Sequence, residues 1–319
     1  MSEVALGIDI GGTNTVFGCI DPQGKCLESG SIPTQKHAHV EDYLDELFEA
    51  IDFTLKKSNN KLKVIGIGIG APNASYYSGT IEKAANLPWK ESIPIAEMVR
   101  SRMDVPVIIT NDANAAAMGE KVFGAAKGMN NFMVITLGTG LGSGIVVNGE
   151  LLYGHDGFAG EVGHMIVRKS GRECGCGRKG CLETYVSATG VKRTVYKLLA
   201  RHLGQSELRD IPFSQLTAKM VAEAAGRGDL VANETFSYTA RMLGEVLANV
   251  VAVISPEAIF LFGGLTKAGD ILFEPVRETL ESQLLDIYKG KIKVLPSGIT
   301  DNAAVLGAAA LIWNNKSIR

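Results

Sequence analysis

An apolar strand that ends in a glycine-rich turn occurs twice in this chain of 319 residues, once near the beginning and once near residue 138. Residues 4–10 lead into Gly11-Gly12, and residues 132–137 lead into the glycines of 138–144. In both places the residues after the turn are again apolar and β-branched, so each turn joins two strands. This repetition predicts a mixed α/β chain with two successive parts that begin on the same plan.

Between and after these turns, strand patterns alternate with helix patterns. Further strands are predicted at 15–20, 26–32, 62–69, 105–109, 145–148, 258–262 and 292–295, and helices at 40–57, 189–203, 214–225, 230–254 and 302–313. Asn148-Gly149 is typical of a hairpin turn, and Gly263-Gly264 is expected to open one more helix. We expect an N-terminal lobe at 1–115, joined by the C-terminal helix at about 300–319, and a C-terminal lobe at 116–299.

The composition argues against several classes of protein. Lys and Arg number 32 against 34 Asp and Glu, so no basic surface for nucleic acid or for an acidic membrane is expected. The chain starts directly on a strand, without a leader sequence, and contains no apolar run long enough for a membrane span. Cys19 and Cys26 form no even disulfide framework with the other cysteines, which favours a reducing compartment. We therefore expect a cytoplasmic protein that binds neither nucleic acid nor membranes.

One histidine and three cysteines lie close together in the sequence: His164, Cys174, Cys176 and Cys181. Three thiolates and an imidazole form the ligand set of a closed tetrahedral zinc site, and the intervening glycines allow the loop to turn around one ion. The cluster therefore predicts a structural zinc ion. Glu161 and Glu183 flank these ligands, so a bound ion would also hold two carboxylates in place.

The first glycine-rich turn combines features that suit a phosphate group. Its residues are Asp9, Gly11, Gly12, Thr13 and Asn14. Backbone amides without a neighbouring Cβ can approach an anion, Thr13 adds a hydroxyl donor, and Asp9 can hold a hydrated Mg²⁺ ion. We predict a phosphate-binding turn, and a plain hairpin turn is the alternative.

The second glycine-rich turn does not match a dinucleotide-binding motif. Its spacing differs from Gly-x-Gly-x-x-Gly, and it leads into a strand where a Rossmann turn would open a helix. Thr139 and Gly140 in this turn, together with Gly263 and Gly264 at a predicted helix start, provide two more backbone-lined surfaces. Together the three segments favour a nucleoside triphosphate held between two lobes.

Asn111 and Asp112 follow the predicted strand 105–109 and precede a helical pattern. Asp112 is therefore expected at a helix N-terminus, at the carboxyl end of a sheet. Taken alone, either residue is most simply a helix cap. In phosphoryl transfer to a hydroxyl group, however, a carboxylate at such a position accepts the proton of the acceptor, and Asn111 would hold a neighbouring hydroxyl.

Read in order, these motifs resemble the ROK family of sugar kinases and sugar-responsive repressors over nearly the whole chain. The motifs are Asp-Ile-Gly-Gly-Thr at 9–13, Asn-Asp-Ala-Asn-Ala-Ala at 111–116, Leu-Gly-Thr-Gly-Leu-Gly-Ser-Gly at 137–144, Ala-Gly-Glu-Val-Gly-His at 159–164 and Cys-Gly-Cys-Gly-Arg-Lys-Gly-Cys-Leu-Glu at 174–183. The resemblance implies the ribonuclease H-like, actin-like ATPase fold, in which two α/β lobes close over ATP, Mg²⁺ and a hexose. It also implies a homodimer.

The resemblance further implies a role for particular side chains. Asp112 would be the general base on the 6-hydroxyl of the sugar, and Asn111, Glu161, His164 and Glu183 would bind the other hydroxyls. His164 would also be a zinc ligand, together with the three cysteines, and would face the metal with one ring nitrogen and the sugar with the other.

Family members that are repressors carry a DNA-binding domain before the first motif, and only eight residues precede Asp9 here. This favours a kinase. Glucose is the expected substrate because Asn86-Leu87-Pro88-Trp89 resembles the glucokinase members, with Asn86 as a sugar ligand. The segment 70–77 departs from the family pattern, so N-acetylmannosamine, N-acetylglucosamine, mannose, fructose and allose stay open as substrates, and polyphosphate as donor. A non-catalytic sugar sensor and a zinc-finger interaction module are the alternative classes of function.

Overall fold

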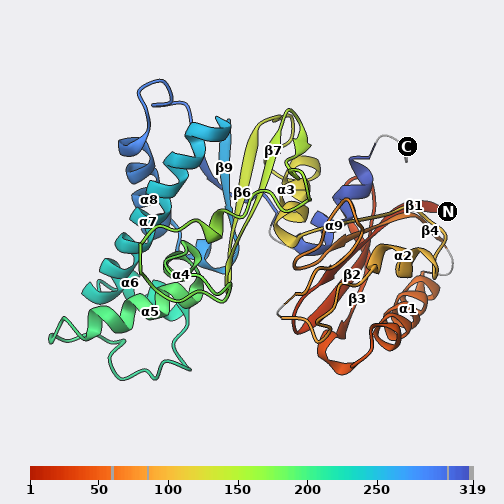
Figure 1. Ribbon diagram of the computed structural model, residues 1–319, viewed down its shortest axis with the longest axis horizontal. Coiled ribbons are helices and arrows are strands. Elements are labelled where there is room, and N and C mark those ends of the chain that lie inside the picture. The colour runs from red at the N-terminus through yellow and green to blue at the C-terminus, as the bar shows by residue number, and fades with distance from the viewer. Residues whose placement is uncertain (59–60, 85, 300–301, 316–319) are drawn as a thin grey trace. The chain divides into compact units, whose positions relative to one another are not determined.

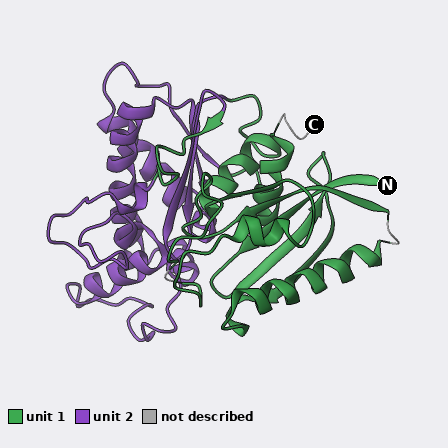
Figure 2. Cartoon of the chain, turned by 45° about the vertical axis from the view of Figure 1, so that its right-hand side comes forward, with its two compact units in different colours: residues 1–129, 150–160, 297–319 green, residues 130–149, 161–296 purple. Residues whose placement is uncertain are grey.

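The computed structural model describes residues 1–58, 61–84, 86–299 and 302–315 (Figure 1). The chain divides into two compact units, each made of segments that are distant in the sequence (Figure 2). The first unit comprises 1–129, 150–160 and 297–319, and the second comprises 130–149 and 161–296. The lobe bounds 1–115 and 116–299 stay a prediction, and positions 300, 301 and 316–319 of the predicted last helix lie outside the described residues.

The first sheet has the strand order β3-β2-β1-β4-β5. Its strands are β1 (Ser2–Ile10), β2 (Asn14–Ile20), β3 (Cys26–Pro33), β4 (Leu62–Gly70) and β5 (Val107–Thr110). The first three strands form an antiparallel meander, and β4 and β5 then run parallel to β1. Because the carboxyl ends of parallel strands share one edge of a sheet, Asp9 lies opposite Gly70, and Gly70 lies opposite Thr110.

The described residues of this unit also form a short 3₁₀ helix, η1 (Thr34–Lys36), and the helices α1 (Val40–Lys57), α2 (Ile95–Arg100), α3 (Asp112–Val122) and α9 (Ala303–Trp313). Helix α1 has the predicted bounds, and its buried side chains recur at helical spacing. Helix α9 packs on β1 and β4 so closely that its backbone contacts the backbone of both strands. A Cβ atom at Gly68 would lie 1.8 Å from the Ala308 carbonyl oxygen, so glycine is required for this close approach.

The second sheet has the strand order β10-β9-β6-β7-β8. Its strands are β6 (Phe132–Leu137), β7 (Leu141–Val147), β8 (Glu150–Leu151), β9 (Ala258–Phe262) and β10 (Lys293–Pro296). As in the first sheet, two antiparallel strands come first and a strand parallel to the first of them follows. Asn148 and Gly149 both have positive φ angles, 52° and 82°, which confirms the predicted hairpin turn.

The predicted start of β7 at residue 145 is wrong. The strand begins at Leu141, because Gly142 and Gly144 already pair with Thr136 and Val134 of β6. Glycine has a low intrinsic preference for strands, but the antiparallel pairing with β6 outweighs it. The second glycine-rich turn is therefore confined to residues 138–140.

The remaining helices are η2 (Val162–His164), α4 (Glu183–Val186), α5 (Ala188–Leu199), α6 (Ala218–Gly226), α7 (Leu230–Ile254), η3 (Gly264–Ala268) and α8 (Asp270–Gln283). Helix α6 starts four residues later than predicted because the Thr217 side chain caps it by accepting from the Met220 N–H. After Gly264 the chain forms only a 3₁₀ turn, and Gly269, at a φ of 61°, separates it from α8. Among the described residues, no helix combines the length and apolarity that a membrane span needs.

Candidate functional site

Two carboxylates meet at the carboxyl edge of the first sheet. Asp9 is the penultimate residue of β1, and Asp112 is the first residue of α3, two positions after β5 ends. Gly70, at the end of β4, lies between them: a Cβ atom there would be 3.6 Å from Asp9 Oδ1 and 3.8 Å from Asp112 Cα. The pairing of β1, β4 and β5 thus brings together two acids that are far apart in the sequence.

The surroundings change the acidity of both groups. Burial, and to a smaller extent the charge of Asp112, raise the pKa of the Asp9 carboxyl to about 6. Solvent reaches the Asp112 side chain, but the protein packed around its other sides desolvates the carboxyl group and raises its pKa. The Ala113 N–H donates to Asp112 Oδ1 at 2.8 Å and opposes this rise. Such a pair can accept a proton from a hydroxyl group or hold a divalent cation.

The helix-cap alternative applies to Asn111 and not to Asp112. Asn111 is the N-cap of α3, and its Oδ1 accepts from the Asn114 N–H at 2.7 Å. Asp112 is the first helical residue, with its side chain open to solvent. Asn111 therefore caps the helix, and Asp112 is not needed for the cap.

The turn at 11–14 lies against the predicted sugar residue Asn86. A Cβ atom at Gly12 would lie 3.1 to 3.3 Å from three atoms of Asn86. Gln35 links the two segments by hydrogen bonds, because its Nε2 donates to the carbonyl oxygens of Gly12 at 2.5 Å and of Asn86 at 3.0 Å. Thr13 and Asn14 are exposed. Gln35 was missed from the sequence, since a single glutamine in a polar stretch has no chemical signature.

The second unit contains a cavity of about 550 Å³ beside the second glycine-rich turn. It is lined by Leu137, Gly138, Thr139, Ala188, Ala218, Lys219, Ala222, Glu223, Gly264, Leu265, Lys267 and Ala268. Gly263 has a φ of 110°, and a Cβ atom there would lie 2.6 Å from the Leu137 carbonyl oxygen, so only glycine fits. An apolar cavity with a few charged groups at its rim suits a flat heterocycle attached to a polar tail. Helix α6, which supplies four lining residues, was predicted without a role.

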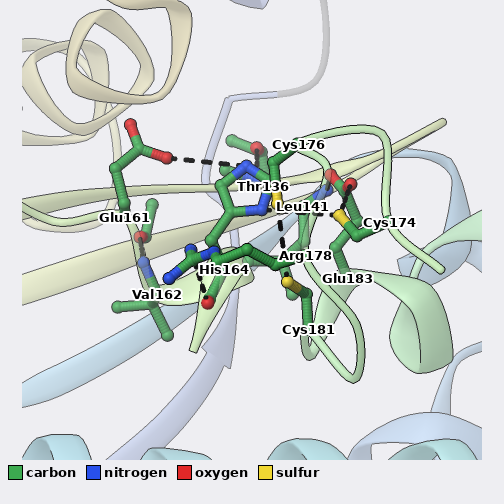
Figure 3. Close-up of polar contacts among 12 residues, drawn as sticks. Thr136, Leu141, Glu161, Val162, His164, Cys174, Cys176, Arg178, Cys181 and Glu183 are labelled. Carbon is green, nitrogen blue, oxygen red and sulfur yellow. Dashed lines mark hydrogen bonds and ion pairs between the residues drawn. The ribbon is translucent and has the colours of Figure 1, made fainter. Parts of the chain in front are cut away.

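The structure brings the four predicted zinc ligands together (Figure 3). One ligand atom from each of His164, Cys174, Cys176 and Cys181 lies within 4.8 Å of every other. Cys174 Sγ is 3.7 Å from His164 Nδ1, and Cys176 Sγ is 3.7 Å from Cys181 Sγ. A tetrahedron with metal–sulfur bonds of about 2.3 Å has edges of about 3.8 Å, so this donor set fits a zinc ion. All five cysteines, including Cys19 and Cys26, are free of disulfide bonds.

Two carboxylates lie next to this cluster, one on each side of it (Figure 3). His164 Nε2 is 4.0 Å from Glu161 Oε2, so the ring nitrogen that faces away from the thiols faces Glu161. Glu183 begins α4, and its Oε2 accepts from the Leu141 N–H at 2.9 Å. Its Oε1 lies 3.6 Å from Cys174 Sγ. Glu161, His164 and Glu183 are thus brought together, while Thr139 and Gly264 line the cavity.

Comparison with known proteins assigns the chain to a family. The model of the ROK family matches residues 5–315. The chain belongs to the ROK family. This ROK protein is 35% identical to a glucokinase of Halalkalibacterium halodurans, over 96% of the chain and 94% of that relative. It is 32% identical to a xylose repressor of Caldicellulosiruptor bescii, over 85% of the chain and 68% of that relative.

A solved structure supports the same assignment. A ROK family glucokinase from Streptomyces griseus, in complex with glucose and AMPPNP, matches with a TM-score of 0.80 and 32% identity. The match covers 97% of the ROK protein and 98% of the glucokinase. The predicted ribonuclease H-like, actin-like ATPase fold is therefore confirmed, and the two five-stranded sheets are its two related halves.

Proposed function

We propose that this ROK protein transfers the γ-phosphoryl group of ATP to the 6-hydroxyl of a hexose, with glucose as the first candidate. The observation that carries the proposal is the pair of Asp9 and Asp112 at one sheet edge, with Asp112 open to solvent. Support also comes from the glucokinase relatives and from the glucose and AMPPNP bound to the Streptomyces griseus enzyme. A reaction at a hydroxyl group needs a nearby base, and Asp112 provides one.

In the proposed reaction, Asp112 accepts the proton of the 6-hydroxyl of the sugar. The oxygen of that hydroxyl group attacks the γ-phosphorus atom of ATP. The new oxygen–phosphorus bond replaces the bond to ADP, which leaves as an anion. Mg²⁺, when bound, would neutralise charge on the phosphate groups, and Asp9 is the residue proposed to hold it. The amides of Gly12, Thr13 and Asn14 are proposed to bind phosphate oxygens. The Gly11 N–H closes the turn by donating to the Asn14 carbonyl oxygen at 3.1 Å.

The nucleotide is proposed to bind in the cavity of the second unit. Ala218, Ala222 and Leu265 would provide apolar contacts for the base, and Gly264 lines the cavity beside them. Gly263 packs against the Leu137 backbone and is proposed to position this segment for the nucleotide. Thr139 and Gly140 are then assigned to its phosphates. An apolar cavity of about 550 Å³ with charged residues at its rim is the physical support for this assignment.

The remaining hydroxyls of the sugar are assigned to five polar side chains: Asn86, Asn111, Glu161, His164 and Glu183. We propose a zinc ion at His164 and the three cysteines, which would restrict the loop that carries Glu161 and Glu183. Because a site built to bond particular hydroxyls rejects sugars that lack them, these residues would set the specificity. A homodimer and a cytoplasmic location stay predictions.

A coupled ADP-release assay with ATP and Mg²⁺ tests the proposal. The sugars are glucose, N-acetylmannosamine, N-acetylglucosamine, mannose, fructose and allose, and mass analysis identifies the product. Glucose is expected to give the highest kcat/KM. A much higher kcat/KM with another sugar would overturn the proposed preference for glucose but not the proposed kinase activity. A parallel series with polyphosphate tests the donor.

A sugar sensor without catalysis is the second candidate, favoured by the likeness to the xylose repressor. Folded, metal-loaded protein that binds a sugar but transfers no phosphate from either donor would favour the sensor. The retention of Asp9, Thr13 and Asp112 argues for the kinase, because a sensor has no need of a base or a phosphate-binding turn.

A further inference from the structure

The side chain of Glu183 joins the cysteine loop to the second glycine-rich turn. Its Oε2 accepts from the N–H of Leu141, the first residue after the turn, at 2.9 Å. Its Oε1 lies 3.6 Å from Cys174 Sγ. Leu141 is 42 positions away from Glu183 in the sequence, and Figure 3 shows the carboxylate between the two segments. One carboxylate therefore contacts both the metal loop and the turn.

The same turn is held at two more points by residues that follow Glu183. The Ala188 N–H donates to the Gly138 carbonyl oxygen at 2.9 Å, and the Thr189 hydroxyl donates to the Thr139 carbonyl oxygen at 3.4 Å. These two contacts orient the carbonyl groups of the turn. The contact from Glu183 instead fixes the N–H of Leu141, and with it the peptide plane between Gly140 and Leu141.

Gly140 leaves room for the carboxylate. A Cβ atom at Gly140 would lie 2.4 Å from Glu183 Oε2, which is closer than any real contact of this kind. The backbone of the turn thus packs directly against the charged group. Gly140 is not among the glycines with a positive φ angle, so the constraint on a side chain here comes from the close approach of Glu183.

We propose that Glu183 is a positioning residue for the nucleotide, through which the cysteine loop sets the shape of the turn at 138–140. This inference rests on the proposed function, in which the turn binds the phosphate groups of ATP. It adds to the assigned role of Glu183 at the sugar, because a carboxylate has several lone pairs and can accept from the Leu141 N–H and from a hydroxyl together. Disturbing Glu183 would then weaken nucleotide binding even without sugar.

The test measures the affinity for AMPPNP by calorimetry without sugar, in metal-loaded protein. Glu183→Ala removes a hydrogen bond to a charged acceptor and is expected to weaken binding about tenfold or more. Glu183→Gln keeps an oxygen that can accept from the Leu141 N–H, so it should recover most of the affinity. Glu173→Ala is the matched control, since this exposed carboxylate of the same loop pairs with Lys179 and should leave affinity unchanged.

A double-mutant cycle with Gly140→Ala tests the contact between Glu183 and the turn without changing the metal ligands. Gly140→Ala is expected to weaken AMPPNP binding when Glu183 is present and to have a much smaller effect in Glu183→Ala protein, because the clash is then absent. Strictly additive effects would overturn the inference, as would wild-type affinity in Glu183→Ala. If the wild-type protein itself binds no AMPPNP, it is the proposed function that fails.

Metal removal provides a second readout on the unsubstituted chain. If the cysteine loop positions Glu183, a chelator should weaken AMPPNP binding by the wild-type protein several-fold and that by Glu183→Ala protein by less than about twofold. Circular dichroism establishes that both proteins stay folded under the chosen conditions. Equal losses in both proteins would mean that the metal acts on the nucleotide site by another route, and would overturn the coupling through Glu183.

Discussion

Asp112 lies close enough to Asp9 that its charge adds to the effect of burial, and together they raise the pKa of the Asp9 carboxyl to about 6. The two acids come from β1 and from the residue that begins α3, and Gly70 at the end of β4 lies close to both. The protein without bound cation therefore holds a proton at this edge in mildly acidic solution.

This relationship predicts a stability that depends on pH. The pKa of Asp9 in the folded protein, about 6, lies above its ordinary value of 3.8, so the folded state binds the proton more tightly than the unfolded chain. The contribution of Asp9 to the free energy of unfolding should be complete below about pH 4. About 2 to 3 kcal/mol of this contribution should be lost as the pH rises through 6. Urea unfolding without divalent cations measures this slope.

Asp9→Asn should reduce the slope near pH 6, because asparagine does not titrate, while the raised pKa of Asp112 still contributes to it. Asp104→Asn replaces an exposed carboxylate of the same unit and should leave the slope as in the wild-type protein. An unchanged slope in Asp9→Asn would show that the proton is held elsewhere.

Replacing Asp112 by asparagine separates catalysis from binding. The amide keeps the size of the side chain but cannot accept the hydroxyl proton, so kcat should fall by about 10² to 10⁴. The dissociation constant for glucose, measured by calorimetry, should change by less than about threefold, because the hydroxyl can still bond to the amide oxygen. Activity within about tenfold of the wild type would refute the assignment of Asp112 as the base.

The parts of the site that were predictable from sequence are those whose chemistry is local. The four metal ligands lie on one loop, so their residue types and spacing alone identify the cluster. Asp9 and Asp112 were identified separately, Asp9 at the end of one predicted strand and Asp112 shortly after another. Their proximity could not be derived, because it depends on the parallel pairing of β1, β4 and β5 across long stretches of chain.

Other features had no signal in the sequence. Ala218 and Ala222 on α6 line the cavity, but small apolar residues at helical spacing look like ordinary core. The contact between Glu183 and the Leu141 N–H joins residues 42 positions apart through a backbone group, which carries no residue-type signature. The start of β7 was misplaced because its glycines suggested a turn, whereas pairing with β6 decided the structure.

Loss of one thiol should remove the metal. The wild-type protein is expected to hold about one zinc ion per chain. Cys176→Ser replaces a strong zinc ligand by a weak one, so the zinc content should fall at least about tenfold. The melting temperature should fall by several degrees, because a bound structural metal contributes directly to folding. Cys26→Ser is the matched control, since Cys26 lies on β3, outside the cluster. Zinc content that stays at the wild-type level by metal analysis would contradict the assignment of Cys176 as a ligand.

A larger side chain at Ala222 should fill the cavity assigned to the base of ATP. Ala222→Phe would occupy part of the space of about 550 Å³ beside Leu265, and overpacking of this kind costs about 1 to 3 kcal/mol. The KM for ATP should therefore rise about tenfold, whereas kcat at saturating ATP and the KM for glucose should stay within about threefold. Ala222→Ser adds only a hydroxyl group and serves as the control, with melting curves to verify folding. An unchanged KM for ATP in Ala222→Phe would place the base outside this cavity, because a bound heterocycle and a phenyl ring cannot share the same apolar wall.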